Sequence, residues 1–228
     1  MIAAIVPSAG KGKRLKARVP KPFLSVAGRP ILAHTLAALK KSGLFGQIIV
    51  AVEPSRIKET VRLLKKEALG RIWVVAGGST RAASVKKALA SVAEECEWVL
   101  VHDAARPLLT RSLIRRTLSA ARKTGAALCA MPVAATVKKA DPRSGIVRST
   151  EDRRQLFLAQ TPQVFRKSLL AGAYKRLGAR ALERTDEAAL FDGSSTCVRI
   201  VEGESDNIKI TTPADIELFQ FYLKRRKK

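Results

Sequence analysis

The alternation of short β-branched runs with helix-length amphipathic segments is the feature that most constrains this fold. The expected strands cover 2–6, 48–52, 72–75, 98–101 and 126–131. The expected helices between them cover 31–41, 55–68, 80–93 and 111–123. Strand–helix–strand crossovers with this spacing build a parallel sheet that is covered by helices on both faces. The sequence therefore predicts an α/β fold with a mostly parallel, doubly wound sheet.

The regular alternation ends after Met131. Residues 134–157 are polar and strand-like, with a turn signal at Asp141-Pro-Arg-Ser-Gly145, and this predicts a projecting hairpin. A helix near 167–177, a short strand at 197–201 and a last helix at 213–223 are expected to follow, the last one capped by Thr212. Because no repeat or low-complexity linker interrupts the chain, we expect a single domain over 1–228 with a β-arm at about 134–157.

The net charge of the chain is strongly positive, which raises the question of a nucleic-acid partner. Lys and Arg number 43 against 19 Asp and Glu, a formal charge of +24 that attracts polyanions. The excess is spread along the chain, with local concentrations at 11–29 and 224–228. Only two Tyr, two Trp and seven Phe are present, so a stacking platform for single strands is poorly supported. A basic nucleic-acid-binding module remains the alternative on charge alone, and no specific nucleic acid is expected.

The apolar segments and cysteines bear on location. The longest mostly apolar stretch, 125–137, is interrupted by Pro132 and is shorter than the roughly 18–20 residues of a membrane span. No positive charge precedes the apolar start of the chain, unlike in a secretory signal. Cys96, Cys129 and Cys197 are an odd number without a C-x-x-C pair, so neither a disulfide framework nor a Cys/His zinc site is expected. We expect a cytoplasmic protein without a membrane helix.

A glycine-rich basic loop follows the first expected strand, as Pro7-Ser-Ala-Gly-Lys-Gly-Lys-Arg14. It matches neither a Walker A loop nor a dinucleotide fingerprint, and a generic turn is the alternative. However, the first 30 residues hold no carboxylate, while Lys or Arg stands at 11, 13, 14, 16, 18 and 21. Glycines let backbone N–H groups approach an anion, and the carboxyl edge of a sheet is where α/β folds bind ligands. These residues predict a phosphate-binding loop, in which Arg14 and Lys21 place positive charge near a transferring phosphoryl group.

Further signals follow other expected strands. Asp103, in His102-Asp-Ala-Ala-Arg-Pro107, is suited to hold Mg²⁺ through a hard oxygen, although a turn-capping role is the alternative. The segment Gly77-Gly-Ser-Thr-Arg81 is either a tight turn before a helix or a backbone loop that grips a base. Segments 185–188 and 206–211 are compatible with ordinary caps and strand ends.

Taken in order, these segments resemble the 2-C-methyl-D-erythritol 4-phosphate cytidylyltransferases of the non-mevalonate isoprenoid pathway. The resemblance runs from Ile2 to Leu223, and its most specific parts are 9–14 with Pro20-Lys21, then 102–107, 161–165, 185–188 and 203–211. It implies a Rossmann-like nucleotidyltransferase fold and a homodimer joined by the projecting β-arm. It also implies the Mg²⁺-dependent reaction of CTP with methylerythritol phosphate, which gives CDP-methylerythritol and pyrophosphate.

The resemblance also implies a role for individual side chains. The residues expected to stabilise the pentacoordinate α-phosphate are Arg14, Lys21 and Lys209. The residues expected to bind the nucleotide are Ala9, Gly10, Lys11, Gly12, Gly78, Ser84 and Asp103, and Asp103 would also bind Mg²⁺. The residues expected around the sugar phosphate are Arg106, Thr136, Arg153, Thr161, Thr185 and Lys209, with Arg153 reaching in from the arm of the partner. The chemistry implied is positioning and electrostatics, without a covalent nucleophile.

Two positions depart from the family pattern. Pro22 stands where the family commonly has Gln, and Ser79 stands where an acidic residue is common, which could weaken ribose or base contacts. The ribitol-5-phosphate cytidylyltransferases share the glycine-rich loop but usually carry Val in place of Ala105, so this residue favours methylerythritol phosphate as the substrate.

Overall fold

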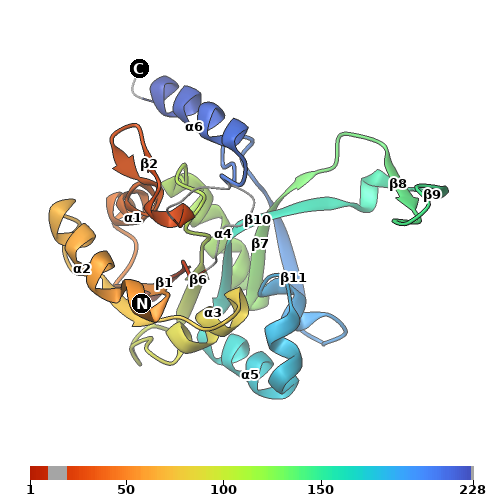
Figure 1. Cartoon of the computed structure of the whole chain (residues 1–228). Coiled ribbons are helices and arrows are strands. Elements are labelled where there is room, and N and C mark those ends of the chain that lie inside the picture. Colours follow the sequence, from red (N-terminus) through yellow and green to blue (C-terminus); the bar gives the residue numbers. More distant parts are fainter. Residues whose placement is uncertain (10–19, 227–228) are drawn as a thin grey trace.

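A seven-stranded sheet forms the centre of the computed structural model, which describes residues 1–9 and 20–226 (Figure 1). The strand order is β11-β7-β10-β6-β1-β4-β5. The strands are β1 Ile2–Pro7, β4 Gln47–Val52, β5 Trp73–Ala76, β6 Trp98–Val101, β7 Ala126–Pro132, β10 Phe157–Arg166 and β11 Val198–Glu202. All neighbouring pairs are parallel except those of β10, which runs antiparallel to both β6 and β7. The prediction of a mostly parallel sheet is confirmed.

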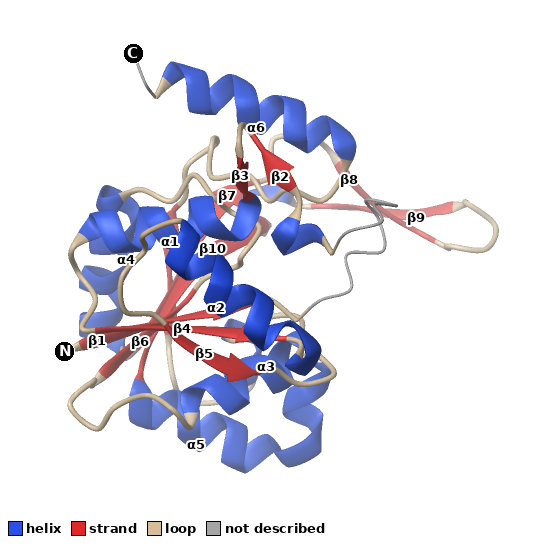
Figure 2. Ribbon diagram, turned by 60° about the vertical axis from the view of Figure 1, so that its left-hand side comes forward, coloured by secondary structure: helices blue, strands red, loops and turns tan. Residues whose placement is uncertain are grey.

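Helices cover both faces of this sheet (Figure 2). They are α1 Ile31–Ser42, α2 Ile57–Lys66, α3 Arg81–Leu89, α4 Arg111–Thr124, α5 Lys167–Leu177 and α6 Pro213–Arg225. Successive side chains of a strand point to opposite faces. Accordingly, Val6 packs with Leu36 of α1 in one buried cluster, while Ile5 packs with Val85 of α3 in the other. The two-sided packing predicted from the crossovers is therefore present.

Strand β10 was not predicted, because the sequence analysis leads directly from the arm to the helix at 167. The strand contains a cis peptide bond at Thr161-Pro162, and its register with β7 shifts between Ala159 and Gln163. A proline within a run normally argues against a central strand. Its second half is nevertheless buried, and Phe165 is fully enclosed between the sheet and α5.

The predicted arm is a two-stranded hairpin of β8 Val137–Ala140 and β9 Val147–Glu151, which projects from the body of the molecule (Figure 1). Its turn is held by Asp141, whose Oδ1 accepts hydrogen bonds from the backbone N–H groups of Arg143 and Ser144. A second small hairpin, β2 Ser25–Val26 with β3 Arg29–Pro30, was not predicted. Short 3₁₀ turns lie at Lys21–Phe23, Pro54–Arg56, Arg153–Gln155, Gly178–Glu183 and Ala188–Phe191.

The order of the strands creates a crevice between β1 and β6. From β1 the chain continues to β4 and β5 on one side of β1, and it then returns to form β6 on the other side. The connections that follow β1 and β6 therefore run in opposite directions along the sheet. In doubly wound sheets, ligands bind outside the carboxyl ends of the strands where this reversal occurs. Ser8 follows β1 and His102 follows β6, and the N–H of His102 donates to the carbonyl of Ile5 at 2.9 Å. Over the described ranges, no helix combines the length and apolar character that a membrane crossing requires.

Candidate active site

Two adjoining hollows open at the carboxyl ends of β1 and β6. The first has a volume of about 130 Å³ and is lined on one side by Ser8, Ala9 and Lys21. The second has a volume of about 230 Å³ and lies toward β10 and the segment that precedes the last 3₁₀ turn. Both are bordered by the same three side chains, namely Arg81, Asp103 and Lys209. These three charged groups therefore form a wall shared by the two hollows.

Asp103 is the acidic centre of this wall. Its Oδ1 accepts a hydrogen bond from Arg81 Nε at 3.0 Å, and its Oδ2 lies 2.8 Å from Lys209 Nζ and 3.7 Å from Arg106 Nε. Burial by itself raises the pKa of the carboxyl, but the positive charges of Arg81 and Lys209 outweigh burial and hold the pKa well below its usual range. Asp103 is therefore ionised at neutral pH, and the carboxylate offers hard oxygens at the junction of the hollows.

Arg81 links Asp103 to a second carboxylate, which lies inside the protein. Its Nη1 donates to both oxygens of Glu187 at 2.8 Å, and Glu187 has no exposed surface. Tyr174 adds a hydroxyl bond to Glu187 at 3.3 Å. The two carboxylates outweigh burial and raise the pKa of Arg81. The sequence analysis missed both Arg81 and Glu187, although each stands within a segment that it singled out, at 77–81 and 185–188.

His102 and Thr161 form a chain of hydrogen bonds that ends at the backbone of Asp103. The ring Nε2 of His102 lies 2.9 Å from the carbonyl of Arg106, so this nitrogen carries the proton and Nδ1 is an acceptor. The Thr161 hydroxyl therefore donates to Nδ1 at 3.0 Å and accepts from the backbone N–H of Asp103 at 3.0 Å. Burial lowers the pKa of His102 to about 4, so the ring is neutral at physiological pH. The chain of bonds fixes the backbone at Asp103.

The first hollow contains part of the predicted nucleotide loop. Lys21 follows this loop, and its Nζ donates to the carbonyl of Ile210 at 3.0 Å. Ala9 lines the hollow beside it. The predicted residues Gly10, Lys11, Gly12 and Arg14 lie outside the described residues. The structure thus brings Lys21 and Ala9 into the hollow that Asp103 borders.

The Gly77-Gly78 turn is shaped by residues of the helix that follows it. The N–H of Gly78 donates to Ser84 Oγ at 3.0 Å, and Ser84 Oγ donates to the carbonyl of Thr80 at 2.9 Å. A side chain at Gly78 would collide with Ala83, so the turn requires glycine at this position. Because Ser84 is fully buried, its hydroxyl supports the turn from inside the protein and is not placed to contact a ligand directly.

The second hollow gathers most of the residues predicted to surround the sugar phosphate. Arg106 is buried, and its Nη1 donates to the carbonyl of Asn207 at 2.7 Å. The residues of the prediction that line this hollow are Arg106, Thr161, Thr185 and Lys209. Thr136 and Arg153 do not line either hollow, since both lie at the base of the arm, where Arg153 donates to the carbonyl of Ala134. These two side chains are exposed.

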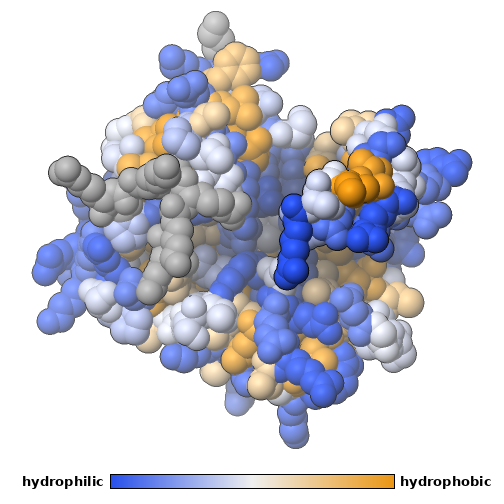
Figure 3. Space-filling model, turned by 45° about the vertical axis from the view of Figure 1, so that its right-hand side comes forward, coloured by the Kyte–Doolittle hydropathy of each residue, from blue (hydrophilic) through white to orange (hydrophobic). Residues whose placement is uncertain are grey.

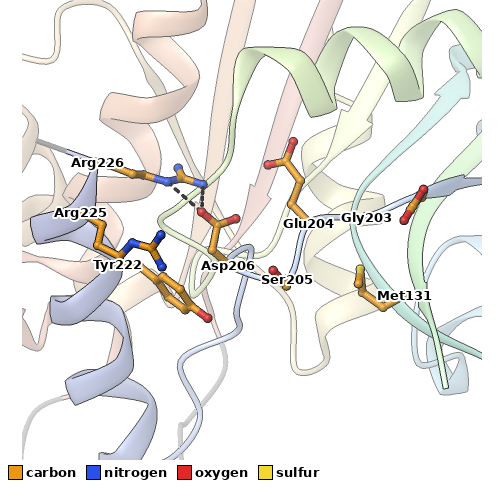
Figure 4. A pocket seen from close by; sticks show the side chains of 9 residues that line it. Met131, Gly203, Glu204, Ser205, Asp206, Tyr222, Arg225 and Arg226 are labelled. Atoms are coloured by element: carbon orange, nitrogen blue, oxygen red, sulfur yellow. Dashed lines mark hydrogen bonds and ion pairs between the residues drawn. The ribbon is translucent and has the colours of Figure 1, made fainter. Parts of the chain in front are cut away.

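A roomier hollow of about 650 Å³ lies between the ends of β7 and β11 and helix α6 (Figure 4). Three of its lining residues are carboxylates, namely Glu202, Glu204 and Asp206. Asp206 is paired with Arg226 at 2.6 Å across this hollow. Neither Lys21 nor Asp103 contributes to its lining. An anionic substrate is therefore better accommodated by the two smaller hollows at the ends of β1 and β6.

Comparison with known proteins identifies the family that carries this site. Residues 2–225 match the family model described as IspD, 2-C-methyl-D-erythritol 4-phosphate cytidylyltransferase. A protein of Alkaliphilus metalliredigens with the name 2-C-methyl-D-erythritol 4-phosphate cytidylyltransferase is 40% identical over 230 residues, which cover 99% of this chain and 94% of that protein. A relative from Desulfotalea psychrophila, named bifunctional enzyme IspD/IspF, is 42% identical over 225 residues. The match covers 99% of this chain but 57% of that bifunctional relative.

Solved structures agree with this family match. The structure of 4-diphosphocytidyl-2C-methyl-D-erythritol synthase from Anaerococcus prevotii has a TM-score of 0.85 and 32% identity, with 98% of each chain covered. The 2-C-methyl-D-erythritol 4-phosphate cytidylyltransferase of Thermus thermophilus has a TM-score of 0.77 and 32% identity, with 97% of this chain and 98% of that chain covered. The fold and the family that the motifs indicated are both confirmed.

Proposed function

The chain belongs to the 2-C-methyl-D-erythritol 4-phosphate cytidylyltransferase family, and from this membership and its site geometry we propose its reaction. The enzyme transfers the cytidylyl group of CTP to 2-C-methyl-D-erythritol 4-phosphate, giving CDP-methylerythritol and pyrophosphate for isoprenoid precursor synthesis. The observation that carries the proposal is the wall of Arg81, Asp103 and Lys209 shared by the two adjoining hollows. The first hollow suits the triphosphate and the second the sugar phosphate, so their phosphates meet at this wall.

The reaction requires charge and position rather than a covalent intermediate. A phosphate oxygen of methylerythritol phosphate attacks the α-phosphorus of CTP in line, a new P–O bond forms, and the bond to pyrophosphate breaks. Lys21 and Lys209 border the first hollow, where their ammonium groups stabilise the negative charge that develops on the α-phosphate. Arg14 adds a third charge in this proposal. The cytosine lies against the backbone of the Gly77-Gly78 turn, which Ser84 holds in shape.

We propose Asp103 as the protein ligand for Mg²⁺. Among the described residues, no group of three or more His, Cys, Asp or Glu side chains gathers to hold a metal. Mg²⁺ commonly uses one or two carboxylates, with substrate phosphates and water as its other ligands, so a single ionised Asp103 between two phosphate-binding hollows fits the ion. When bound, the ion neutralises phosphate charge. The chain contributes the fixed carboxylate, while Arg106 contacts the sugar phosphate on the other side.

We propose a homodimer in which the arm completes the partner's site. Thr136 and Arg153 belong to the sugar-phosphate set but lie at the base of the arm, outside the hollows of their own chain. The arm also exposes Ile146 and Val147, whose side chains form an apolar patch on the projecting lobe (Figure 3). Exposed apolar patches of this kind commonly mark protein contacts. A second copy would cover the patch and bring Arg153 to the opposite second hollow.

Two further parts of the proposal concern the whole chain. We propose that residues 1–228 form one nucleotidyltransferase domain, because a single sheet draws strands from Ile2 through to Glu202. We also propose a cytoplasmic location, which is consistent with three free cysteines, two of them buried.

The test is pyrophosphate release from CTP with each candidate acceptor in turn. We expect release with methylerythritol phosphate and Mg²⁺, much slower release with ribitol 5-phosphate, and none without an acceptor. Equal or faster release with ribitol 5-phosphate would overturn the substrate assignment. The absence of release with either polyol phosphate, from a folded dimer, would overturn the reaction class.

A further inference from the structure

Glu187 is a carboxylate enclosed in the apolar core beneath the site. It has no exposed surface and follows directly after Asp186, which lines the second hollow. Tyr174, whose hydroxyl donates to Glu187, belongs to the buried cluster on the α3 and α5 side of the sheet. Burial of an ionised carboxylate is costly unless charged and hydrogen-bonding partners compensate for lost water. Burial raises the pKa of Glu187, and Arg81 opposes this rise because its Nη1 donates to both carboxylate oxygens and so favours the ionised form.

The two oxygens of Asp103 are held in different ways as a result. Oδ1 is bonded to Arg81, whose guanidinium is clamped from behind by Glu187. Oδ2 is bonded to Lys209, whose side chain is 37% exposed and has no such clamp among the described contacts. A lysine is a point charge on a flexible stem, whereas an arginine held by two carboxylates has a fixed plane. The bond from Arg81 therefore holds Oδ1 in a fixed position, whereas the bond between Lys209 and Oδ2 can be exchanged for a bond to another partner.

We propose that Glu187 and Arg81 are positioning residues that aim Asp103 for the transfer step, an inference that rests on the proposed function. Glu187 fixes the guanidinium of Arg81, and Arg81 fixes Oδ1 of Asp103. Lys209 can then exchange Oδ2 for a substrate phosphate while the carboxylate keeps its direction. Glu187 also balances the charge of Arg81, so that the guanidinium repels an approaching cation less strongly. Neither Glu187 nor Tyr174 touches the reacting atoms.

A purely structural role for Glu187 is the competing explanation. The same carboxylate joins α3 to α5 through Arg81 and Tyr174, so its loss could loosen the fold without a specific effect on the reaction. The two roles differ in what they do to the rate. A positioning role lowers kcat for the folded enzyme, since a misplacement of about 1 Å can cost about 10²-fold. A structural role lowers the melting temperature and leaves the kcat of the folded fraction unchanged.

The central experiment compares Glu187→Gln with two controls by steady-state pyrophosphate release. We expect Glu187→Gln to lower kcat at least about tenfold while the KM for CTP changes less than about threefold. Glu67→Gln is the charge-matched control, because Glu67 pairs with Arg29 at 2.6 Å outside both hollows. Phe191→Leu is the stability-matched control, because Phe191 stacks on Phe165 in the same core cluster. We expect both controls to retain kcat within about twofold, given that neither residue lines a hollow or takes part in the described hydrogen bonds of Asp103 and Arg81.

A double-mutant cycle tests whether Glu187 acts through Arg81. Arg81→Lys keeps a positive charge but replaces the fixed plane, in which Nε bonds Asp103 and Nη1 bonds Glu187, by one ammonium on a flexible stem, so we expect a loss of kcat similar to that of Glu187→Gln. If the two act in series, the double variant is no more than about threefold slower than the slower single variant, whereas independent effects would multiply. Arg81→Lys also provides the test if Glu187→Gln does not fold, because a kcat within twofold of the unmutated value in Arg81→Lys would overturn the proposal.

A binding measurement provides a readout that does not depend on turnover. Calorimetry with Mn²⁺ and saturating CTP, without sugar phosphate, reports the affinity of the site for a divalent cation. We expect Glu187→Gln to weaken Mn²⁺ at least about fivefold, because the charge of Arg81 is no longer balanced, and Glu67→Gln to leave it unchanged.

The outcomes separate this inference from the proposed function. If the unmutated enzyme releases no pyrophosphate, the proposed function fails. If the unmutated enzyme is active and Glu187→Gln matches it in both kcat and Mn²⁺ affinity, the positioning role fails alone. A loss of kcat in Phe191→Leu as large as that in Glu187→Gln, or multiplicative losses in the cycle, would also overturn the positioning role.

Discussion

Lys21→Ala is the change that most directly tests the electrostatic mechanism. The ammonium of Lys21 borders the first hollow and is oriented by a 3.0 Å hydrogen bond to the carbonyl of Ile210. Because the charge is oriented before substrate arrives, it acts most strongly when the α-phosphate expands and gains charge. Loss of one such donor typically costs about 2.7–4 kcal/mol of transition-state stabilisation, or roughly 10²–10³ in kcat. We expect the KM for CTP to change far less.

The effect of the same variant on stability is small by comparison. The hydrogen bond between Lys21 and Ile210 is partly exposed, so its net contribution to the free energy of unfolding is about 1 kcal/mol. A loss of that size lowers the melting temperature by about 2–4 °C in a chain of this length. The predicted fall in rate is therefore much larger than general destabilisation explains, and the two can be measured separately by pyrophosphate release and thermal unfolding.

Lys167→Ala is the matched control for this experiment. Lys167 also donates from Nζ to backbone carbonyls, those of Val92 at 3.1 Å and Ala93 at 3.0 Å, and it lies outside both hollows. We expect it to lose a comparable amount of stability and to retain kcat. A Lys21→Ala enzyme whose defect is confined to KM, with kcat intact, would refute the reasoning, because Lys21 would then bind substrate and transition state equally.

Three further predictions follow from the arm, the buried histidine and the net charge. Lys21→Ala and Arg153→Ala homodimers should each be nearly inactive. When the two chains are mixed equally and refolded, about half the dimers are mixed and each mixed dimer has one intact site, so about a quarter of the unmutated activity should return. Native mass spectrometry checks the mixing, and no recovery from confirmed mixed dimers would place Arg153 in its own chain's site. The pKa of His102 is about 4 in the folded protein, against 6.5 for an unperturbed histidine, so the unfolded state binds this proton first and the free energy of unfolding should fall by up to about 3 kcal/mol between pH 6.5 and 4. Urea unfolding of His102→Gln, which lacks this group, should show a flatter pH dependence. The affinity for random-sequence DNA should be low and should fall steeply as salt is added, because phosphate contacts release counterions. Sequence-selective binding at physiological salt in a filter assay would instead support a nucleic-acid-binding protein.

The elements that were predicted correctly are those whose burial follows a simple pattern. Residues 48–52 are apolar throughout because both faces of β4 are covered, and the helix at 111–124 repeats its apolar residues on one face. Strand β10 has neither signal, since Thr161, Pro162 and Gln163 interrupt its apolar residues. The two polar residues, Thr161 and Gln163, form bonds to distant segments, such as the one from the Gln163 side chain to Asp186, which no local pattern can reveal.

The candidate site was predictable to a similar extent. Asp103 stands out in the sequence because it follows an apolar strand, and Lys21 stands out because it follows a glycine-rich loop. Glu187 could not be distinguished from a surface carboxylate, because its importance lies in a partner 106 positions away in the chain. Only the fold shows that Arg81 reaches both Glu187 and Asp103, and that segments 77–81 and 185–188 both border the second hollow.

The segment after β11 shows how this site depends on the return of the chain. Residues 203–211 form no strand or helix, and in the sequence they have the appearance of an ordinary strand end. In the fold, the N–H of Ile210 donates to the carbonyl of Ala105 at 2.9 Å, while the carbonyl of Ile210 accepts from Lys21. The neighbouring Lys209 bonds Asp103, and Asn207 accepts from Arg106. One irregular segment thus bonds the loop that follows β6 and orients two ammonium groups, so a change in its backbone should disturb both hollows together.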